Sequence, residues 1–126
     1  MQDTIKKFKF RNSGVILNAP PAIENEFVKL GFRTNFDDQA KSTDTLVFIN
    51  NNNELLEFLQ KDLGQIEADS RLWIAYPKGT SKIKTDVNRD IIWATGEQFG
   101  VTAVAAISID TTWSAIRFRP VDRVGK

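Results

Sequence analysis

The feature that most constrains this chain is an alternation between short, continuous apolar runs and stretches with helical periodicity. Three runs, at residues 15–17, 46–49 and 72–76, are too short for helices and suit strands buried on both faces. Strands that alternate with helices pair in parallel, because each crossover brings the chain back in the same direction. The sequence therefore predicts an α/β protein with a doubly wound, mostly parallel sheet and helices on both faces.

Three helices are expected between and after these strands. Pro21 begins the first helix, an asparagine of residues 50–53 caps the second, and Thr85 caps the third, with Asp86 in its first turn. Gly31 is placed to end the first helix. The inner faces are expected to consist, in chain order, of Ile23, Phe27 and Leu30, then Leu55, Leu59 and Ile66, then Ile91, Ile92, Thr95 and Phe99.

The remaining segments show β-type patterns. Residues 32–36 alternate apolar and polar side chains and predict a second, weaker strand. Residues 101–109 and 113–118 are two β runs with a short connection, so they predict an antiparallel hairpin that adds one antiparallel strand at the edge of the sheet. Residues 6–10 also alternate, and the segment 1–11 is expected to form either an edge strand or an arm.

Composition limits both the architecture and the chemistry. A chain of 126 residues with 41% hydrophobic and 26% charged residues predicts one globular domain, residues 1–126. The absence of histidine and cysteine excludes Cys nucleophiles, Cys/His zinc sites and Ser-His-Asp triads. We expect no metal, no cofactor and no catalytic residue, although aspartates, lysines and Tyr76 remain as acids or bases.

The chain shows neither a membrane helix nor a secretion signal. No apolar run approaches the length of a membrane helix, and the amino-terminal segment lacks the apolar core of a signal peptide. The sequence therefore predicts a soluble, cytoplasmic protein without membrane contact.

The charges are segregated along the chain. Residues 1–11 carry a net charge of +3, residues 12–70 of −6 and residues 71–126 of +4. Such a pattern is typical of phosphate or nucleic-acid recognition, or of head-to-tail self-association. Alternatively, the segments mix in space and the asymmetry cancels.

The loops after the parallel strands are the expected place for a ligand, since open α/β sheets bind ligands beyond the carboxyl ends of their strands. Asn18 and Asn50 follow the first two apolar runs, and a basic loop, residues 78–86, follows the third. This loop leads to a helix start, whose free N–H groups favour an anion. A solvated basic loop is the alternative interpretation. The candidate anion-binding residues are Lys78, Ser81, Lys82, Lys84, Thr85 and Arg89.

The final β run carries a second basic feature. Trp113, Arg117 and Arg119 alternate with apolar residues and therefore share one face. Arginines beside an aromatic ring can stack on nucleic-acid bases. Two arginines are thin support for that reading, so a protein interface or protection of the sheet edge is favoured over nucleic acid.

The element order resembles the latter half of the S-adenosylmethionine-dependent methyltransferase fold. The segments TDTLVFINN, SRLWIAYPK and VTAVAAISIDTTWSAIRFRP are similar to its fourth to seventh strands. The resemblance implies a truncated Rossmann-like sheet. The first loop departs from it, because VILNAPPAI has two prolines and no glycine. Pro20 and Pro21 lack backbone donors, so we expect that S-adenosylmethionine does not bind.

A closer resemblance, over nearly the whole chain, is to an uncharacterised bacterial family of small domains. Its patterns LNAP, LW.AYPK..S..KTD..RD..W and SIDDTWSA.RFRP are matched here by residues 17–20, 72–78, 84–90 and 108–120, with Trp93. The resemblance supports the predicted fold and implies no activity.

Together these features predict a non-catalytic α/β domain. Its strand-end loops are expected to bind an anionic ligand, such as a phosphate-bearing small molecule, or a protein partner. A degenerate or atypical methyltransferase-like enzyme is the alternative.

Overall fold

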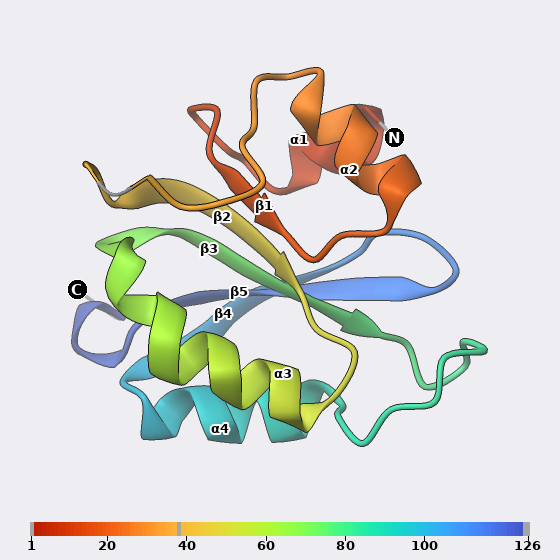
Figure 1. Cartoon of the computed structure of the whole chain (residues 1–126). Coiled ribbons are helices and arrows are strands. Elements are labelled where there is room, and N and C mark those ends of the chain that lie inside the picture. Colours follow the sequence, from red (N-terminus) through yellow and green to blue (C-terminus); the bar gives the residue numbers. More distant parts are fainter. Residues whose placement is uncertain (1, 38, 125–126) are drawn as a thin grey trace.

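A five-stranded mixed sheet forms the centre of the protein (Figure 1). The structure is a computed structural model that describes residues 2–37 and 39–124. The strands lie in the order β1-β2-β3-β5-β4. Their bounds are β1 Val15–Leu17, β2 Ser42–Phe48, β3 Ile66–Pro77, β4 Val101–Ser108 and β5 Trp113–Pro120, and those of the helices are α1 Gln2–Lys7, α2 Pro21–Val28, α3 Asn52–Glu57 and α4 Arg89–Gln98.

The strand directions confirm the parallel pairing predicted for the first three apolar runs and the antiparallel C-terminal hairpin. Ile16 pairs with Leu46, and Val47 pairs with Ile74, in parallel ladders between β1, β2 and β3. The C-terminal hairpin is antiparallel, and its second strand, β5, inserts between β3 and β4. The prediction that the antiparallel strand lies at the edge of the sheet is therefore wrong, because β5 is internal and β4, the first strand of the hairpin, forms the edge.

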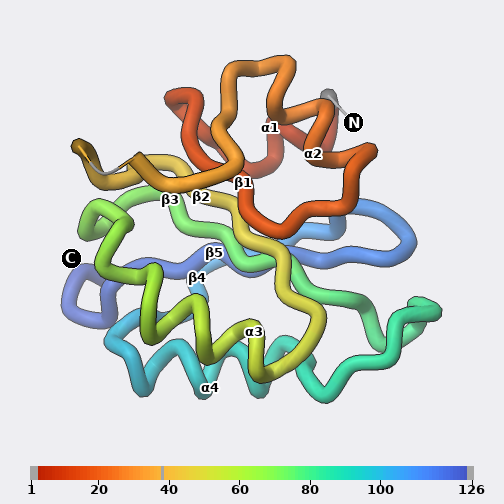
Figure 2. The backbone as a smooth tube through the Cα atoms, in the orientation of Figure 1, coloured from red at the N-terminus to blue at the C-terminus, as the bar shows by residue number. Residues whose placement is uncertain are grey.

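Helices cover both faces of the sheet, α1 and α2 on one side and α3 and α4 on the other (Figures 1 and 2). Successive residues of β3 divide between the two layers, since Leu72 and Ile74 pack with α3 and α4, whereas Trp73 and Ala75 pack with α2. A strand buried on both faces has no polar side, which explains its continuous apolar run. Among the described residues, no helix is long and apolar enough to span a membrane.

The amino-terminal segment is neither an edge strand nor an arm, so that prediction is wrong. Residues 2–7 form α1, Lys9 turns the chain with a φ of 58°, and Phe8 is fully buried. The Phe8 ring packs edge-on against Trp73, with ring centroids 5.2 Å apart, and its carbonyl accepts a hydrogen bond from Trp73 Nε1. Burial of the Phe8 side chain thus holds α1 in place. This helix is too short for helical periodicity to be recognised in its sequence.

The weak strand predicted at residues 32–36 is also absent. Arg33 alone makes an isolated parallel bridge with Val15, on the edge of β1 that faces away from β2. The chain then turns through Asp37, whose carboxylate pairs with the Arg33 guanidinium at 2.8 Å. The next strand begins at Ser42, earlier than the apolar run indicated.

The helices differ from the predictions in register and length. Leu30 and Ile91 are exposed rather than inward-facing. The α-helical part of the second helix, α3, ends at Glu57 and is followed by a π-helical turn and a 3₁₀ turn. Ile66, predicted on the inner face of this helix, is instead the first residue of β3. Ile23, Phe27, Leu55, Leu59 and Ile92 are buried as predicted.

Candidate functional site

The carboxyl ends of β1, β2 and β3 meet at one edge of the sheet, together with the turn between β4 and β5 (Figure 2). Asn18, Asn50 and Lys78 all follow the strands at this edge, as predicted. The loop from β3 to α4 projects at the same edge (Figure 2). We call this region the strand-end site.

The first part of the site is a polar cluster built around the carboxylate of Glu54. Asn18 Nδ2 donates to Glu54 Oε1 at 2.9 Å and to the Phe48 carbonyl at 3.0 Å. The backbone N–H and Nδ2 of Asn50 donate to the same Glu54 oxygen at 2.9 and 3.2 Å. The carboxylate thus links the loops after β1 and β2.

Sequence reasoning named Asn18 and Asn50 but missed Glu54. The available signal was spacing, because Glu54 lies three residues after Asn51, as in a capping box. Asn51 does cap α3, and its side chain accepts from the Glu54 N–H at 2.9 Å. Asn18 has a φ of 59°, a left-handed conformation that asparagine tolerates better than most residues.

A groove of about 470 Å³ lies between the ends of β1 and β2 and the start of α3. Its polar wall carries three carboxylates, those of Glu54, Glu57 and Asp62. Burial raises the pKa of Asp62 above its ordinary value. The groove therefore has a negative lining, which disfavours an anionic ligand in this part of the site. Among the described residues, no group of three potential ligand side chains is arranged to hold a metal ion.

The second part of the site is the basic loop after β3, and Lys78 anchors its beginning. The Lys78 N–H donates to the Thr112 carbonyl at 2.8 Å, and Nζ donates to Ser108 Oγ at 2.6 Å and to the Asp110 carbonyl at 2.5 Å. These bonds fasten the loop to the β4–β5 turn. The ammonium group of Lys78 is thus already engaged within the protein.

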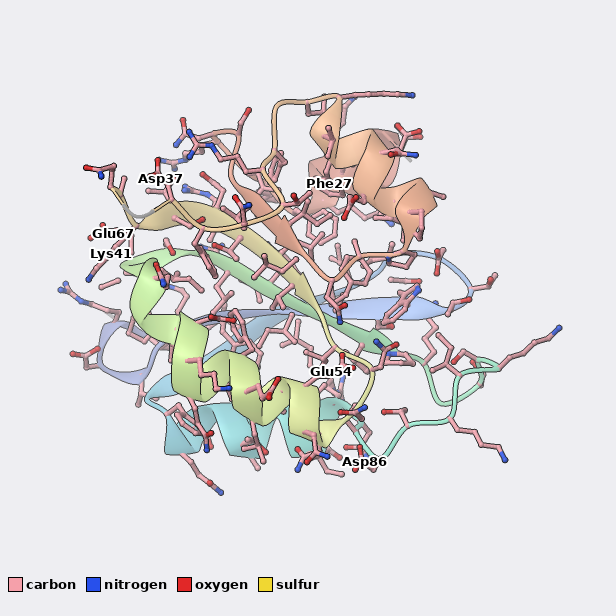
Figure 3. All side chains as sticks on the ribbon, viewed as in Figure 1. Phe27, Asp37, Lys41, Glu54, Glu67 and Asp86 are labelled. Atoms are coloured by element: carbon pink, nitrogen blue, oxygen red, sulfur yellow. The ribbon has the colours of Figure 1, made fainter. Side chains whose placement is uncertain are left out.

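Asp86 anchors the other end of the loop. Its carboxylate accepts from the Asn52 N–H at 2.8 Å, in the first turn of α3, and Figure 3 shows Glu54 and Asp86 near that helix start. An acid at a helix N-terminus is stabilised by the unpaired N–H groups and the helix dipole. The anion-binding capacity of this helix start is therefore used by the protein itself.

The predicted start of the third helix is wrong by a few residues. Asn88, not Thr85, caps α4, since its side chain accepts from the Ile91 N–H at 2.9 Å. Thr85 Oγ1 instead accepts from the Val87 N–H at 3.2 Å. Val87 is buried in the core on the α3 and α4 side, which holds residues 85–87 outside the helix.

The remaining candidates stay in or beside the loop. Lys82 and Lys84 are exposed, and neither takes part in an ion pair with any residue that the structure describes. Ser81 Oγ is shielded from solvent and has no hydrogen-bond partner among the residues that the structure describes. Arg89 is the first residue of α4 and is exposed. The loop therefore offers two exposed ammonium groups, those of Lys82 and Lys84.

Tyr76, just before this loop, is the strongest remaining acid–base candidate. Burial raises the pKa of its phenol above the ordinary value of 10.0. The phenol stays protonated at neutral pH and can donate a hydrogen bond, but it is a poor general base.

Comparisons with protein-family models, with curated proteins and with solved structures found no match to this chain. Both resemblances noted from the sequence therefore stay predictions, and the functional argument depends on the geometry of the site.

Proposed function

We propose that this protein is a non-catalytic α/β domain that binds an anionic ligand through the loop after β3. The observation that carries the proposal is the pair of exposed lysines, Lys82 and Lys84, in a loop anchored at both ends by Lys78 and Asp86. Anchoring reduces the ordering cost of ligand binding. A phosphate-bearing small molecule is the ligand class that suits these groups.

Several donors must act together, because one exposed ion pair contributes only about 0–1 kcal/mol. Lys82 and Lys84 supply charge at the exposed surface of the loop. Arg89 adds charge at the start of α4, where the helix dipole also favours an anion. The acidic groove is lined by residues 17–18, 47–49, 54, 57–58 and 62 rather than by this loop, so it takes no part in the proposal.

The alternative, a methyltransferase-like enzyme, is favoured by one observation. The Arg33 bridge lies on the outer edge of β1, so the chain leaves β1 toward that edge and leaves β2 toward β3, in the opposite direction. In a doubly wound sheet, a ligand binds where the connections change direction in this way. Here that place is the end of β1, next to the groove of about 470 Å³. The acidic lining, the prolines after β1 and the protonated Tyr76 weigh against a working cofactor site.

Phosphate titrations followed by amide NMR test the proposal. At low salt, inorganic phosphate and nucleotides should shift the signals of residues 78–90, and the shifts should weaken steeply as salt is added. A variant with Lys82→Ala and Lys84→Ala should lose binding and keep its stability, whereas Lys29→Ala, at an exposed lysine after α2, should change neither. Unmoved signals at low salt would overturn the proposal. Calorimetry that showed micromolar binding of S-adenosylmethionine would favour the enzyme instead.

A further inference from the structure

The face of the sheet that carries α1 and α2 holds a second basic feature, away from the strand-end site. Trp73, Arg117 and Ala105 are direct cross-strand neighbours on β3, β5 and β4. Trp73 is buried beneath Phe8, Arg117 is half-buried, and Ala105 is exposed. The covering layer therefore ends over β5.

A pocket of about 290 Å³ lies where this covering layer ends. Lys7, the last residue of α1, and Lys9 form one wall, and Ala105 and Ile107 of β4 form the other. Arg117 lies between the walls. We call this cavity the Arg117 pocket.

The Arg117 guanidinium forms no ion pair with any residue that the structure describes. Its Nε atom is shielded from solvent and has no hydrogen-bond partner within the described part of the chain. Burial lowers its pKa, and the positive charges of Arg71, Arg119 and Arg11 lower it further, while the negative charge of Asp69 raises it. Asp69 lies nearby but is held by Arg119 through two bonds, of 2.8 and 3.0 Å. A half-buried cation among like charges is unfavourable unless an anion joins it.

The two basic segments of the sequence come together at the Arg117 pocket. The basic amino-terminal segment contributes Lys7 and Lys9, and the basic C-terminal part contributes Arg117. The acidic stretch separates the two segments along the chain, and the fold brings these three basic residues to one pocket. Trp113 does not join them, because it is buried against Phe48, with ring centroids 5.0 Å apart.

We propose that the Arg117 pocket binds a phosphate monoester of a small apolar or aromatic group. Guanidinium groups bind phosphate through two parallel hydrogen bonds, and Lys7 and Lys9 add charge at the rim. Ala105 and Ile107 supply apolar contact for the rest of the ligand. The cavity is near the lower limit of small-molecule pockets, about 300 Å³, and therefore suits one small ligand rather than a polymer.

Amide NMR with phenyl phosphate as the probe tests this inference. Phenyl phosphate should shift the signals of residues 7–9, 105–107 and 117 and should bind more tightly than inorganic phosphate, which lacks the apolar group. Arg117→Gln should weaken binding at least about tenfold. It should not lower the melting temperature, because it removes an unpaired charge. Lys9→Glu, at an exposed position, provides a second variant that reverses charge without touching the core.

The control is the variant with Lys82→Ala and Lys84→Ala, which should keep the phenyl phosphate shifts at the Arg117 pocket. Failure of this inference is therefore distinguishable from failure of the loop proposal. Absent shifts at residues 7–9 and 105–107, or unchanged affinity in Arg117→Gln and Lys9→Glu, would overturn it. Binding of a thymidine oligonucleotide at this face without binding of phenyl phosphate would also overturn it, in favour of nucleic acid.

Discussion

Single residues set how closely β1 and β2 approach one another. A Cβ atom added at Gly14, just before β1, would lie 1.8 Å from the carbonyl oxygen of Asp44 in β2. The Gly14 carbonyl also accepts from the Arg33 N–H at 2.9 Å, so its backbone is held from both sides. The obstructing atom belongs to a strand backbone and cannot move as a flexible side chain would.

Gly14→Ala should therefore destabilise the protein by about 3 kcal/mol or more, at the upper end for overpacking. Urea denaturation followed by tryptophan fluorescence measures the change. The matched control is Gly79→Ala, because a Cβ at Gly79 meets nothing within 4 Å. Equal stability of the two variants would contradict the close approach.

At the scale of elements, α1 is held by the residue that follows it. Phe8 is fully buried, and its ring stacks on Phe10 at a centroid distance of 5.4 Å and meets Phe27 edge-on at 5.9 Å. A six-residue helix is marginal by itself. Its position must therefore depend on this aromatic cluster.

Phe8→Ala should cost about 3–5 kcal/mol of unfolding free energy, the usual loss for a buried phenylalanine. It should also increase hydrogen exchange in residues 2–9. Leu30→Ala serves as the control, since Leu30 is 49% exposed and should change stability by less than about 0.5 kcal/mol. A small effect of Phe8→Ala, or exchange confined to other segments, would show that α1 is held differently.

The strands at the centre were predictable because burial on both faces leaves a continuous apolar run. The segment around Phe8 was not, since its partner Trp73 lies 65 residues away and no local pattern records that contact. The start of α4 was ambiguous for a different reason. Thr85 and Asn88 are both good caps, and the choice is made by burial of Val87 between them.

At the scale of the molecule, the sequence placed the strand-end residues at the correct edge but did not reveal how they are used. Lys78 forms hydrogen bonds to the β4–β5 turn, and Asp86 accepts a hydrogen bond from α3. Both contacts join segments that are distant in the sequence. The Arg117 pocket depends on the register of β5 between β3 and β4 and on the position of α1. Local periodicity predicts neither the register of β5 nor the position of α1. The segregation of charge along the chain, in contrast, did point to the basic segments that meet at this pocket.

The composition also determines how the whole molecule responds to pH. Without histidine or cysteine, no side chain has an ordinary pKa between about 4.5 and 10, so stability should be nearly constant from about pH 6 to 8.5. A change greater than about 1.4 kcal/mol over that range, the equivalent of one pKa unit, would contradict this.

Below this range two opposite effects are expected. The pKa of Asp69 is lowered by Arg119, and that of Asp37 by the Gln39 N–H and Arg33, so their stabilising contributions are complete above the unfolded pKa of about 3.9. Those contributions are lost as the pH falls through the lower folded pKa values. Burial raises the pKa of Asp62, so protonation of Asp62 instead increases stability as the pH falls through its folded pKa.

Urea denaturation at a series of pH values tests these directions. The loss of stability at acidic pH should be less steep for Asp69→Asn than for the unmodified protein, and steeper for Asp62→Asn. If the unfolding free energies of the two variants fell equally with decreasing pH, the opposite pKa shifts of Asp69 and Asp62 would be contradicted.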